Sequence, residues 1–197
     1  MALAGSPVRS QDRAGGLNCR LTKGVPVSFL SNLFGKRSAS NAAIRPLWHR
    51  VVEIAREKPW YADYGVADSV PGRFDAITLV LTLVLLRMES DPALIEPSVR
   101  LTELFVDDMD GQLRESGIGD LVVGKHMGKL MGVLGGRLGA FREALPLRGE
   151  ALSEAVARNV TRTEGGDLAG LAQAVLALAD TLAATSAEDL LAGRIAR

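Results

Sequence analysis

Cysteine and histidine are scarce in this chain of 197 residues. The single cysteine, Cys19, excludes a disulfide within the chain and fits a reducing compartment. The two histidines, His49 and His126, lie far apart in the sequence, so no pattern of metal ligands is present. No serine or cysteine lies in a recognisable nucleophile motif. The sequence therefore predicts no metal site, no catalytic residue and no cofactor.

An excess of charge of either sign is also absent, because 23 Lys and Arg side chains balance 23 Asp and Glu side chains. Nucleic-acid-binding proteins usually carry a basic excess, so we expect no direct contact with nucleic acid. The longest apolar run, Ala76 to Leu86, lies between Asp75 and Arg87 and is too short to cross a bilayer. We expect the protein to be cytoplasmic, or on the matrix side of the mitochondrial inner membrane if the source is a eukaryote. Any membrane contact is expected to be peripheral, at the inner face of the cytoplasmic membrane.

Apolar residues recur with helical spacing over most of the chain, and no convincing strand pattern is present. We expect an all-α fold, with about seven helices in a single domain spanning residues 41–193. Its central helix, from Phe74 to Met88, is apolar nearly all round, which is typical of a buried helix. The breaks between helices are expected at polar or proline-containing segments, namely Asp68–Gly72, Asp91–Pro92, Pro97, Pro146 and Gly149.

The chain before residue 41 differs in composition from the rest. Residues 1–27 are rich in Gly, Ser, Pro and Arg and have no periodicity, which predicts a disordered tail. An organelle presequence and a true start near Val27 are the alternatives. Residues 28–40 are expected to form a short amphipathic segment and linker before a helix capped by Asn41. The apolar face of this segment, followed by Lys36 and Arg37, suits either a membrane interface or a position folded onto the domain.

All Trp and Tyr residues of the chain lie in one region, as Trp48, Trp60, Tyr61 and Tyr64. An aromatic cluster of this kind usually belongs to a core, but it can also form the wall of an apolar groove. The sequence leaves both interpretations open.

A helical hairpin is predicted from Leu101 to Phe141. Its first helix is acidic and its second is basic, and Asp120 is a good N-cap for the second. On the first helix Asp107, Asp110 and Arg114 point away from the apolar face. Asp108 falls at the edge of that face, where a carboxylate needs a partner or a purpose. The remaining charges of the hairpin are Glu103, Glu115, Lys125, Lys129, Arg137 and Arg142. For most of them a solvated face with weak ion pairs is the simpler interpretation.

Glycines recur at every fourth position of the second helix, as Gly124, Gly128, Gly132 and Gly136. Each interior glycine costs roughly 1 kcal/mol relative to alanine, so the four together oppose the helix by about 4 kcal/mol. Something is therefore expected to approach the backbone closely on this side. A neighbouring helix of the same chain, a partner segment on a bare basic groove, and simple tolerance are the three explanations.

Two separated segments carry a family pattern. The first has an aromatic-led acidic helix followed by R-E-x-G-I-G-D and V-G-K, and reads FVDDMDGQLRESGIGDLVVGK at residues 105–125. The second has an aromatic entry and an R-F-D helix, and reads PWYADYGVADSVPGRFDAITLVLTLVLLRM at residues 59–88. In both segments, and in the same order, the chain resembles the ubiquinol–cytochrome c chaperone family, whose mitochondrial members assist cytochrome b during assembly of the bc1 complex.

This resemblance implies a non-enzymatic chaperone that binds newly made cytochrome b or another bc1 assembly factor. The family's mitochondrial chaperone works with a small partner subunit near the ribosome exit, and the sequence does not show whether this chain does either. We expect partner binding through an apolar groove walled by Trp48, Trp60, Tyr61 and Tyr64, and through the charged, glycine-rich hairpin. The hairpin residues expected to bind a partner are Asp107, Asp108, Asp110, Arg114, Asp120, Gly124, Lys125, Gly128, Lys129, Gly132 and Arg137.

An enzyme is the alternative. A helical protein that binds a lipid or an isoprenoid in its apolar groove can use an acidic helix to hold magnesium. Such an enzyme needs a second acidic motif on a facing helix, and this sequence has none. The chaperone interpretation is therefore favoured.

Overall fold

The computed structural model describes residues 27–115 and 120–197, with side chains described for residues 41–112, 115 and 128–197. The helices are α1 (Val27–Ala55), α2 (Lys58–Ala62), α3 (Val70–Glu89), α4 (Ile95–Glu115), α5 (Asp120–Leu147), α6 (Gly149–Asn159), α7 (Leu168–Ala184) and α8 (Ala187–Leu191), with a 3-10 turn, η1 (Pro92–Leu94). In these ranges the only β pairing is an isolated bridge between Val66 and Arg162. The predicted all-α class is confirmed. The tail predicted over residues 1–27 lies, except for Val27, outside the described residues.

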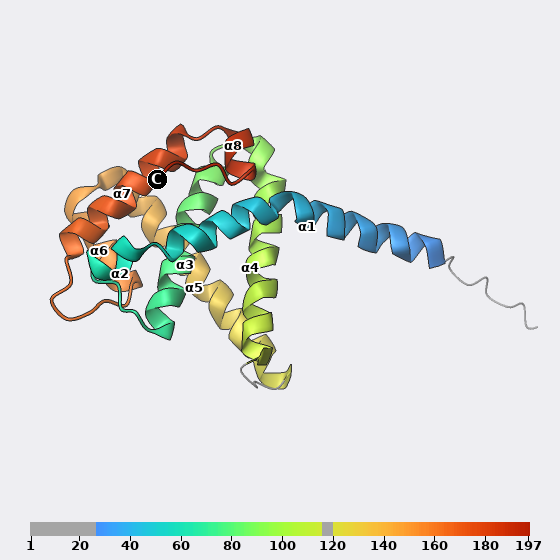
Figure 1. The fold of residues 1–197 in the computed structure, drawn as a ribbon, viewed down its shortest axis with the longest axis horizontal. Coiled ribbons are helices and arrows are strands. Elements are labelled where there is room, and N and C mark those ends of the chain that lie inside the picture. Colours follow the sequence, from blue (N-terminus) through green and yellow to red (C-terminus); the bar gives the residue numbers. More distant parts are fainter. Residues whose placement is uncertain (1–26, 116–119) are drawn as a thin grey trace, which may run out of the picture.

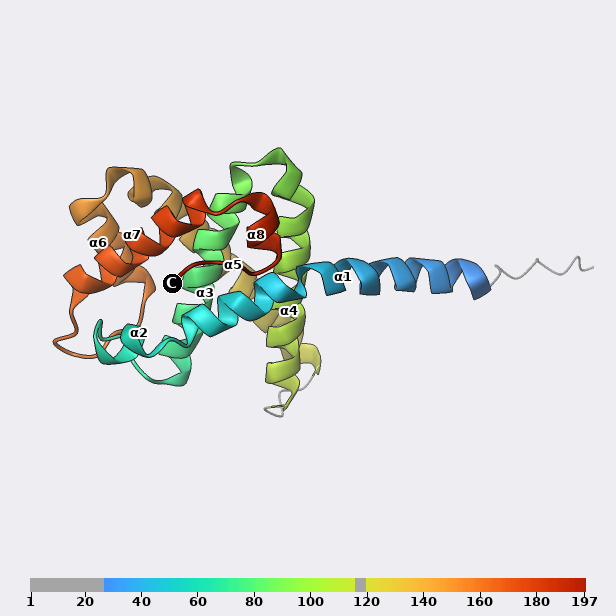
Figure 2. The same cartoon turned by 45° about the horizontal axis from the view of Figure 1, so that its top comes forward.

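Helix α3 is the centre of the fold, as its all-round apolar character predicts. It packs against α1, α5 and α7, and both views show these helices around it (Figure 1, Figure 2). Most of its side chains are buried, including Thr78 and Thr82, whose hydroxyls donate to backbone carbonyls one turn earlier. The loop expected over Asp68–Gly72 is shorter than predicted, because Val70, Pro71 and Gly72 belong to α3. The Ser69 hydroxyl caps α3 by accepting from the Gly72 N–H at 3.3 Å, so the helix begins at Val70.

Helix α1 is continuous from Val27 to Ala55, so Asn41 lies inside a helix and does not cap one. Its C-terminal part crosses α3 and α4, while its N-terminal part runs beyond the rest of the fold (Figure 1, Figure 2). The end of the chain closes onto the same helix, because Arg50 Nη2 donates to the Ile195 carbonyl at 3.0 Å. Gly193 makes this approach possible for two reasons. Its φ of +72° is one that other residues rarely adopt, and a Cβ at this position would lie only 2.7 Å from the Pro46 carbonyl oxygen.

Of the helix breaks predicted at Pro97 and around Pro146, the structure contains only the second. Pro97 lies in the first turn of α4 and does not break the chain as expected, because the first residues of a helix have no intrahelical bond for proline to remove. The break predicted around Pro146 and Gly149 is confirmed, since α5 ends at Leu147 and α6 begins at Gly149. Arg148, between them, has a left-handed φ of 55°.

None of the helices, over the part of the chain that the structure describes, is both long and apolar enough to cross a membrane.

Candidate functional site

The hairpin formed by α4 and α5 has a buried side that matches the expected apolar stripe. Leu101, Leu104, Phe105 and Met109 of α4 are buried. Phe105 meets Trp48 of α1 edge to face, with ring centroids 6.0 Å apart. The hairpin is therefore anchored to α1 and α3 along this side.

The acidic side of α4 faces solvent. Asp107 and Asp108 are exposed, and Asp110 is half-buried. Gln112 Nε2 donates to Asp108 Oδ2 at 3.1 Å. The predicted place of Asp108 at the apolar edge is wrong, because the residue is exposed, and the partner that it was expected to need is Gln112 of the same helix. Four other predicted partner-binding residues have no described side chain, namely Arg114, Asp120, Gly124 and Lys125.

The glycine side of α5 is open. Gly128, Gly132 and Gly136 are exposed, and a Cβ built at each of them meets no other atom within 4 Å. Lys129 beside them is exposed as well. Among the described residues no neighbouring helix packs on these three glycines, so that explanation is wrong for the described part of the chain. Two explanations stay open for them, a partner segment and simple tolerance.

Arg137 does not belong to this open surface, although the sequence placed it there. Its side chain is 7 % exposed and forms an ion pair with Asp75 of α3, whose side chain is 12 % exposed. Asp75 Oδ1 accepts from Arg137 Nη2, and Asp75 Oδ2 accepts from the Thr161 N–H at 2.8 Å and the Thr161 hydroxyl at 2.6 Å. The pair therefore joins α3, α5 and the loop after α6 inside the core.

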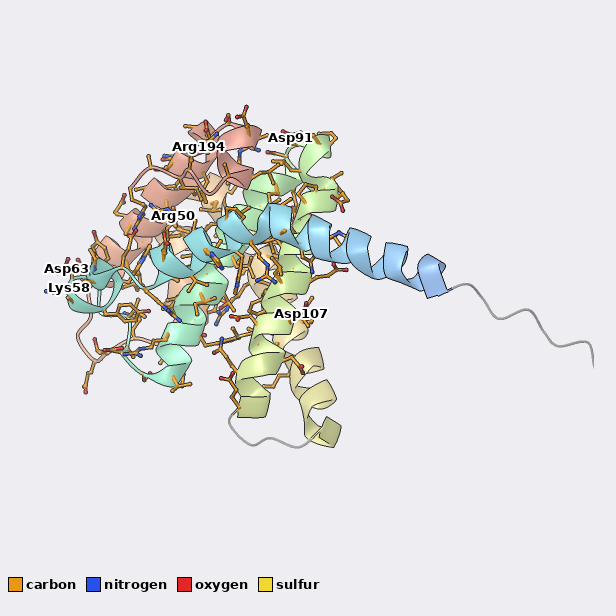
Figure 3. All side chains as sticks on the ribbon, turned by 45° about the vertical axis from the view of Figure 1, so that its right-hand side comes forward. Arg50, Lys58, Asp63, Asp91, Asp107 and Arg194 are labelled. Atoms are coloured by element: carbon orange, nitrogen blue, oxygen red, sulfur yellow. The ribbon has the colours of Figure 1, made fainter. Side chains whose placement is uncertain are left out.

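An open groove of about 1010 Å³ lies between the hairpin and the start of α3. Its apolar surface comes from α2, α3, α4 and α5, and its rim carries charged side chains. The lining residues are Arg56, Lys58, Tyr61, Asp68, Val70, Pro71, Arg73, Phe74, Ile77, Met109, Gln112 and Leu130. Figure 3 labels Lys58 at the corner where α1 meets α2, and Asp107 on α4. We call this site the hairpin groove.

The rim of the hairpin groove is mainly basic. Arg73 Nε donates to Asp68 Oδ1 at 2.7 Å, and this hydrogen bond lowers the pKa of Asp68 and raises the pKa of Arg73. Arg56 and Lys58 are exposed and form no ion pair with any described residue. The Tyr61 hydroxyl donates to the Ala55 carbonyl at 2.8 Å, and partial burial raises the pKa of Tyr61.

Of the four aromatic residues predicted to wall a groove, only Tyr61 lines this one. Trp48 and Trp60 are buried in the core, where Trp60 Nε1 donates to the Ile54 carbonyl at 2.7 Å. Tyr64 packs against the edge of Trp60 and lines a separate, smaller pocket with Arg197. For Trp48 and Trp60 the core interpretation is therefore the correct one.

Val70 and Pro71 were not predicted as groove residues because the sequence of Asp68–Gly72 is typical of a loop, and Arg73 was predicted only as the start of the R-F-D helix. A serine followed within two residues by a proline is a common helix start, and that signal was available. Val70 is 84 % exposed at the mouth of the hairpin groove. Across the described residues, no group of three or more His, Cys, Asp or Glu side chains could hold a metal ion.

A second, shallower groove of about 430 Å³ lies along α4 and is acidic. It is lined by Ser98, Val99, Thr102, Glu103, Val106 and Asp107 of α4 and by Met131 of α5. Glu103 accepts from Arg100 at 3.0 Å, so part of its charge is balanced. The two grooves therefore differ in size and in the sign of their charge.

Comparison with known proteins matches residues 62–197 to the family described as Ubiquinol-cytochrome C chaperone. The structure is similar to one described as the crystal structure of the Cbp3 homolog from Brucella abortus, with 34 % sequence identity and a TM-score of 0.68. That similarity covers 85 % of this chain and 95 % of the Brucella abortus chain. No curated protein matches the chain.

Proposed function

The chain belongs to the ubiquinol–cytochrome C chaperone family, and from this membership we propose that its hairpin groove holds a segment of newly made cytochrome b or of another bc1 assembly factor. Membership of the family makes the protein a non-enzymatic assembly factor for ubiquinol–cytochrome c reductase. The alternative of a lipid- or isoprenoid-binding enzyme is therefore set aside.

The single observation that carries the groove proposal is an apolar surface left open to solvent. Ile77, Phe74 and Leu130 are only partly buried although each packs against the core. Contiguous apolar surface of this kind usually marks an interaction site. Met109 also lines the groove, and although it is largely buried its flexible side chain can adjust to different bound segments.

The glycine side of α5 is proposed as the second contact. Since no atom of the described chain lies near Gly128 or Gly132, a partner's backbone can approach α5 closely there. Lys129 on the same side, with Asp107 and Asp108 across the hairpin, would set the orientation of the partner through charge. Asp110, Arg114, Asp120, Gly124 and Lys125 complete the proposed contact.

A location on the cytoplasmic side, with peripheral contact with the membrane, fits this role. A chaperone for a membrane protein benefits from lying close to the bilayer where its client is inserted. The segment Ser28–Arg37 lies in the part of α1 that runs beyond the fold (Figure 1), and its sequence combines apolar residues with a basic end. We propose that this segment makes the contact.

The test is an affinity pull-down with the full chain from its native membranes, followed by detection of unassembled cytochrome b. The variant Val70→Gln with Ile77→Gln makes the groove polar without changing charge, and we expect it to lose most of the captured cytochrome b. Leu147→Gln is the matched control, because Leu147 is 72 % exposed and lies outside the groove. Equal capture by both variants would contradict the groove proposal.

Deletion of the gene provides the test in the cell. We expect less assembled bc1 complex, with haem synthesis unchanged. Normal levels of cytochrome b in the deletion strain would count against the proposed role.

A further inference from the structure

We propose that the hairpin groove selects apolar segments that carry carboxylates at their ends. This inference rests on the proposed function and adds the chemistry of the bound segment. The observation behind it is the charge of the rim, where the described lining residues include three cations and one carboxylate.

The carboxylate is already neutralised, and two of the cations are not. Asp68 pairs with Arg73 at 2.7 Å, so Arg56 and Lys58 supply the remaining charge of the rim. Glu57 lies between them in sequence but accepts from Arg197 at 2.6 Å and 2.8 Å. Arg56 and Lys58 therefore form no ion pair with a described carboxylate, and both are available to a carboxylate of a bound segment.

The dimensions of the groove suit a short helix. An α-helix is about 10 Å across and rises 1.5 Å per residue, so a volume of about 1010 Å³ holds about two turns. Phe74 and Ile77 would contact the apolar face of such a helix. Arg56 and Lys58, from the end of α1 and the start of α2, would contact its acidic end.

The chain's own amphipathic segment does not fit these requirements. Residues 28–37 are apolar enough, but they end in Lys36 and Arg37. Like charges placed together at a binding site disfavour binding. We therefore assign the hairpin groove to a segment of another molecule and not to residues 28–37.

Fluorescent peptides test this selection directly on the full chain. Two peptides share one apolar helical core of about two turns, and they differ only in whether two Glu or two Lys residues flank it. We expect the Glu-flanked peptide to bind about tenfold more tightly, because two rim cations each contribute a modest amount. The preference is expected to shrink as salt is added.

Charge reversal identifies the residues responsible. Arg56→Glu with Lys58→Glu is expected to abolish the preference for Glu-flanked peptide or to invert it. Arg148→Glu with Arg158→Glu is the matched control, since both are exposed, lie outside the groove and change the net charge equally. A preference for the Lys-flanked peptide, or no preference, would overturn the inference.

Anionic vesicles of phosphatidylcholine with phosphatidylglycerol provide the competing ligand. If these vesicles bind in an Arg56- and Lys58-dependent manner while neither peptide binds, the rim recognises lipid and the inference is wrong. The pull-down separates the two proposals. One outcome is that Val70→Gln with Ile77→Gln loses cytochrome b while the unmodified protein shows no preference between the two peptides. That outcome would support the groove as the binding site and reject only its selection of acidic ends.

Discussion

Two segments in the described part of α5 differ in how much of their side-chain surface is buried. In the half from Leu134 to Ala144, which we call the buried half, Leu134, Arg137 and Phe141 are enclosed by the core. In the half from Gly128 to Gly132, which we call the open half, glycines and Lys129 face solvent beside the hairpin groove. Glycines occur in both halves, so the difference between them is what surrounds them. The buried half holds large side chains inside the core, whereas a Cβ at Gly128 or Gly132 in the open half would meet no described neighbour.

The largest expected effect comes from breaking the ion pair of the buried half. Arg137→Ala leaves the Asp75 carboxylate buried without its cation, and we expect a loss of about 3–5 kcal/mol in the free energy of unfolding. Chemical denaturation measures this loss. Arg142→Ala is the control, because its pair with Glu89 is exposed to solvent, which screens it, and we expect a much smaller loss. Similar losses in both variants would contradict the comparison.

The second-largest expected loss of stability comes from shortening an apolar side chain in the buried half of α5. Leu134 is 1 % exposed, so Leu134→Ala should leave a cavity and lower the free energy of unfolding by about 3 kcal/mol. Denaturant titration of the full chain provides the measurement. A loss below about 1 kcal/mol would mean that this part of α5 packs loosely.

The open half should respond in the opposite direction. Gly132→Ala is expected to stabilise the protein by about 1 kcal/mol, because the added Cβ meets no atom and alanine favours the helix. Gly128→Leu should likewise leave the fold intact while blocking capture of a partner. The variant Gln173→Leu, exposed on α7, controls for added apolar bulk. A markedly destabilised Gly128→Leu would show that the open half is packed after all.

The charge of the two lysines predicted to contact the partner, Lys129 in the open half and Lys125 before it in sequence, can be tested separately. Lys125→Glu with Lys129→Glu should slow association with the partner and change its salt dependence, because charges at the edge of an interface act mainly on association rate. Association kinetics with purified partner measure this effect. Normal rates would remove these lysines from the proposed site.

The smallest effect concerns the exposed ion pair of the groove rim. The pKa of Asp68 is lowered by its hydrogen bond with Arg73, so its contribution to stability is present above its ordinary pKa and is lost as the pH falls below it. The free energy of unfolding should therefore fall slightly less between neutral and strongly acidic pH in Asp68→Asn than in the unmodified protein. Denaturant titrations at pH 7 and pH 3 test this. An unchanged pH dependence would show that solvent fully screens the pair.

Local pattern accounts for most of the fold. The apolar periodicity of α3, the hairpin and α7 could be predicted because each depends on residues a few positions apart. Arg137 could not be placed, since its partner Asp75 lies 62 residues earlier and helical spacing carries no information about that distance. Asp108 was misplaced for a related reason, because a helical wheel gives its direction but not how far the neighbouring helices extend. The hairpin groove was missed in part because its wall begins at Val70, in a segment whose composition is typical of loops.

Asp75 also constrains when the protein can fold during its synthesis. Its carboxylate accepts from Thr161, 86 residues later in the chain, and Arg50 of α1 donates to Ile195, 145 residues later. A nascent chain that has emerged only as far as α5 contains every wall of the hairpin groove, but it lacks the groups that complete the core around Asp75. The groove is therefore expected to become competent only when nearly all of these residues have left the ribosome. A chain cut before Thr161 is therefore expected to contain the residues that line the hairpin groove without the hydrogen bonds that complete the core behind them.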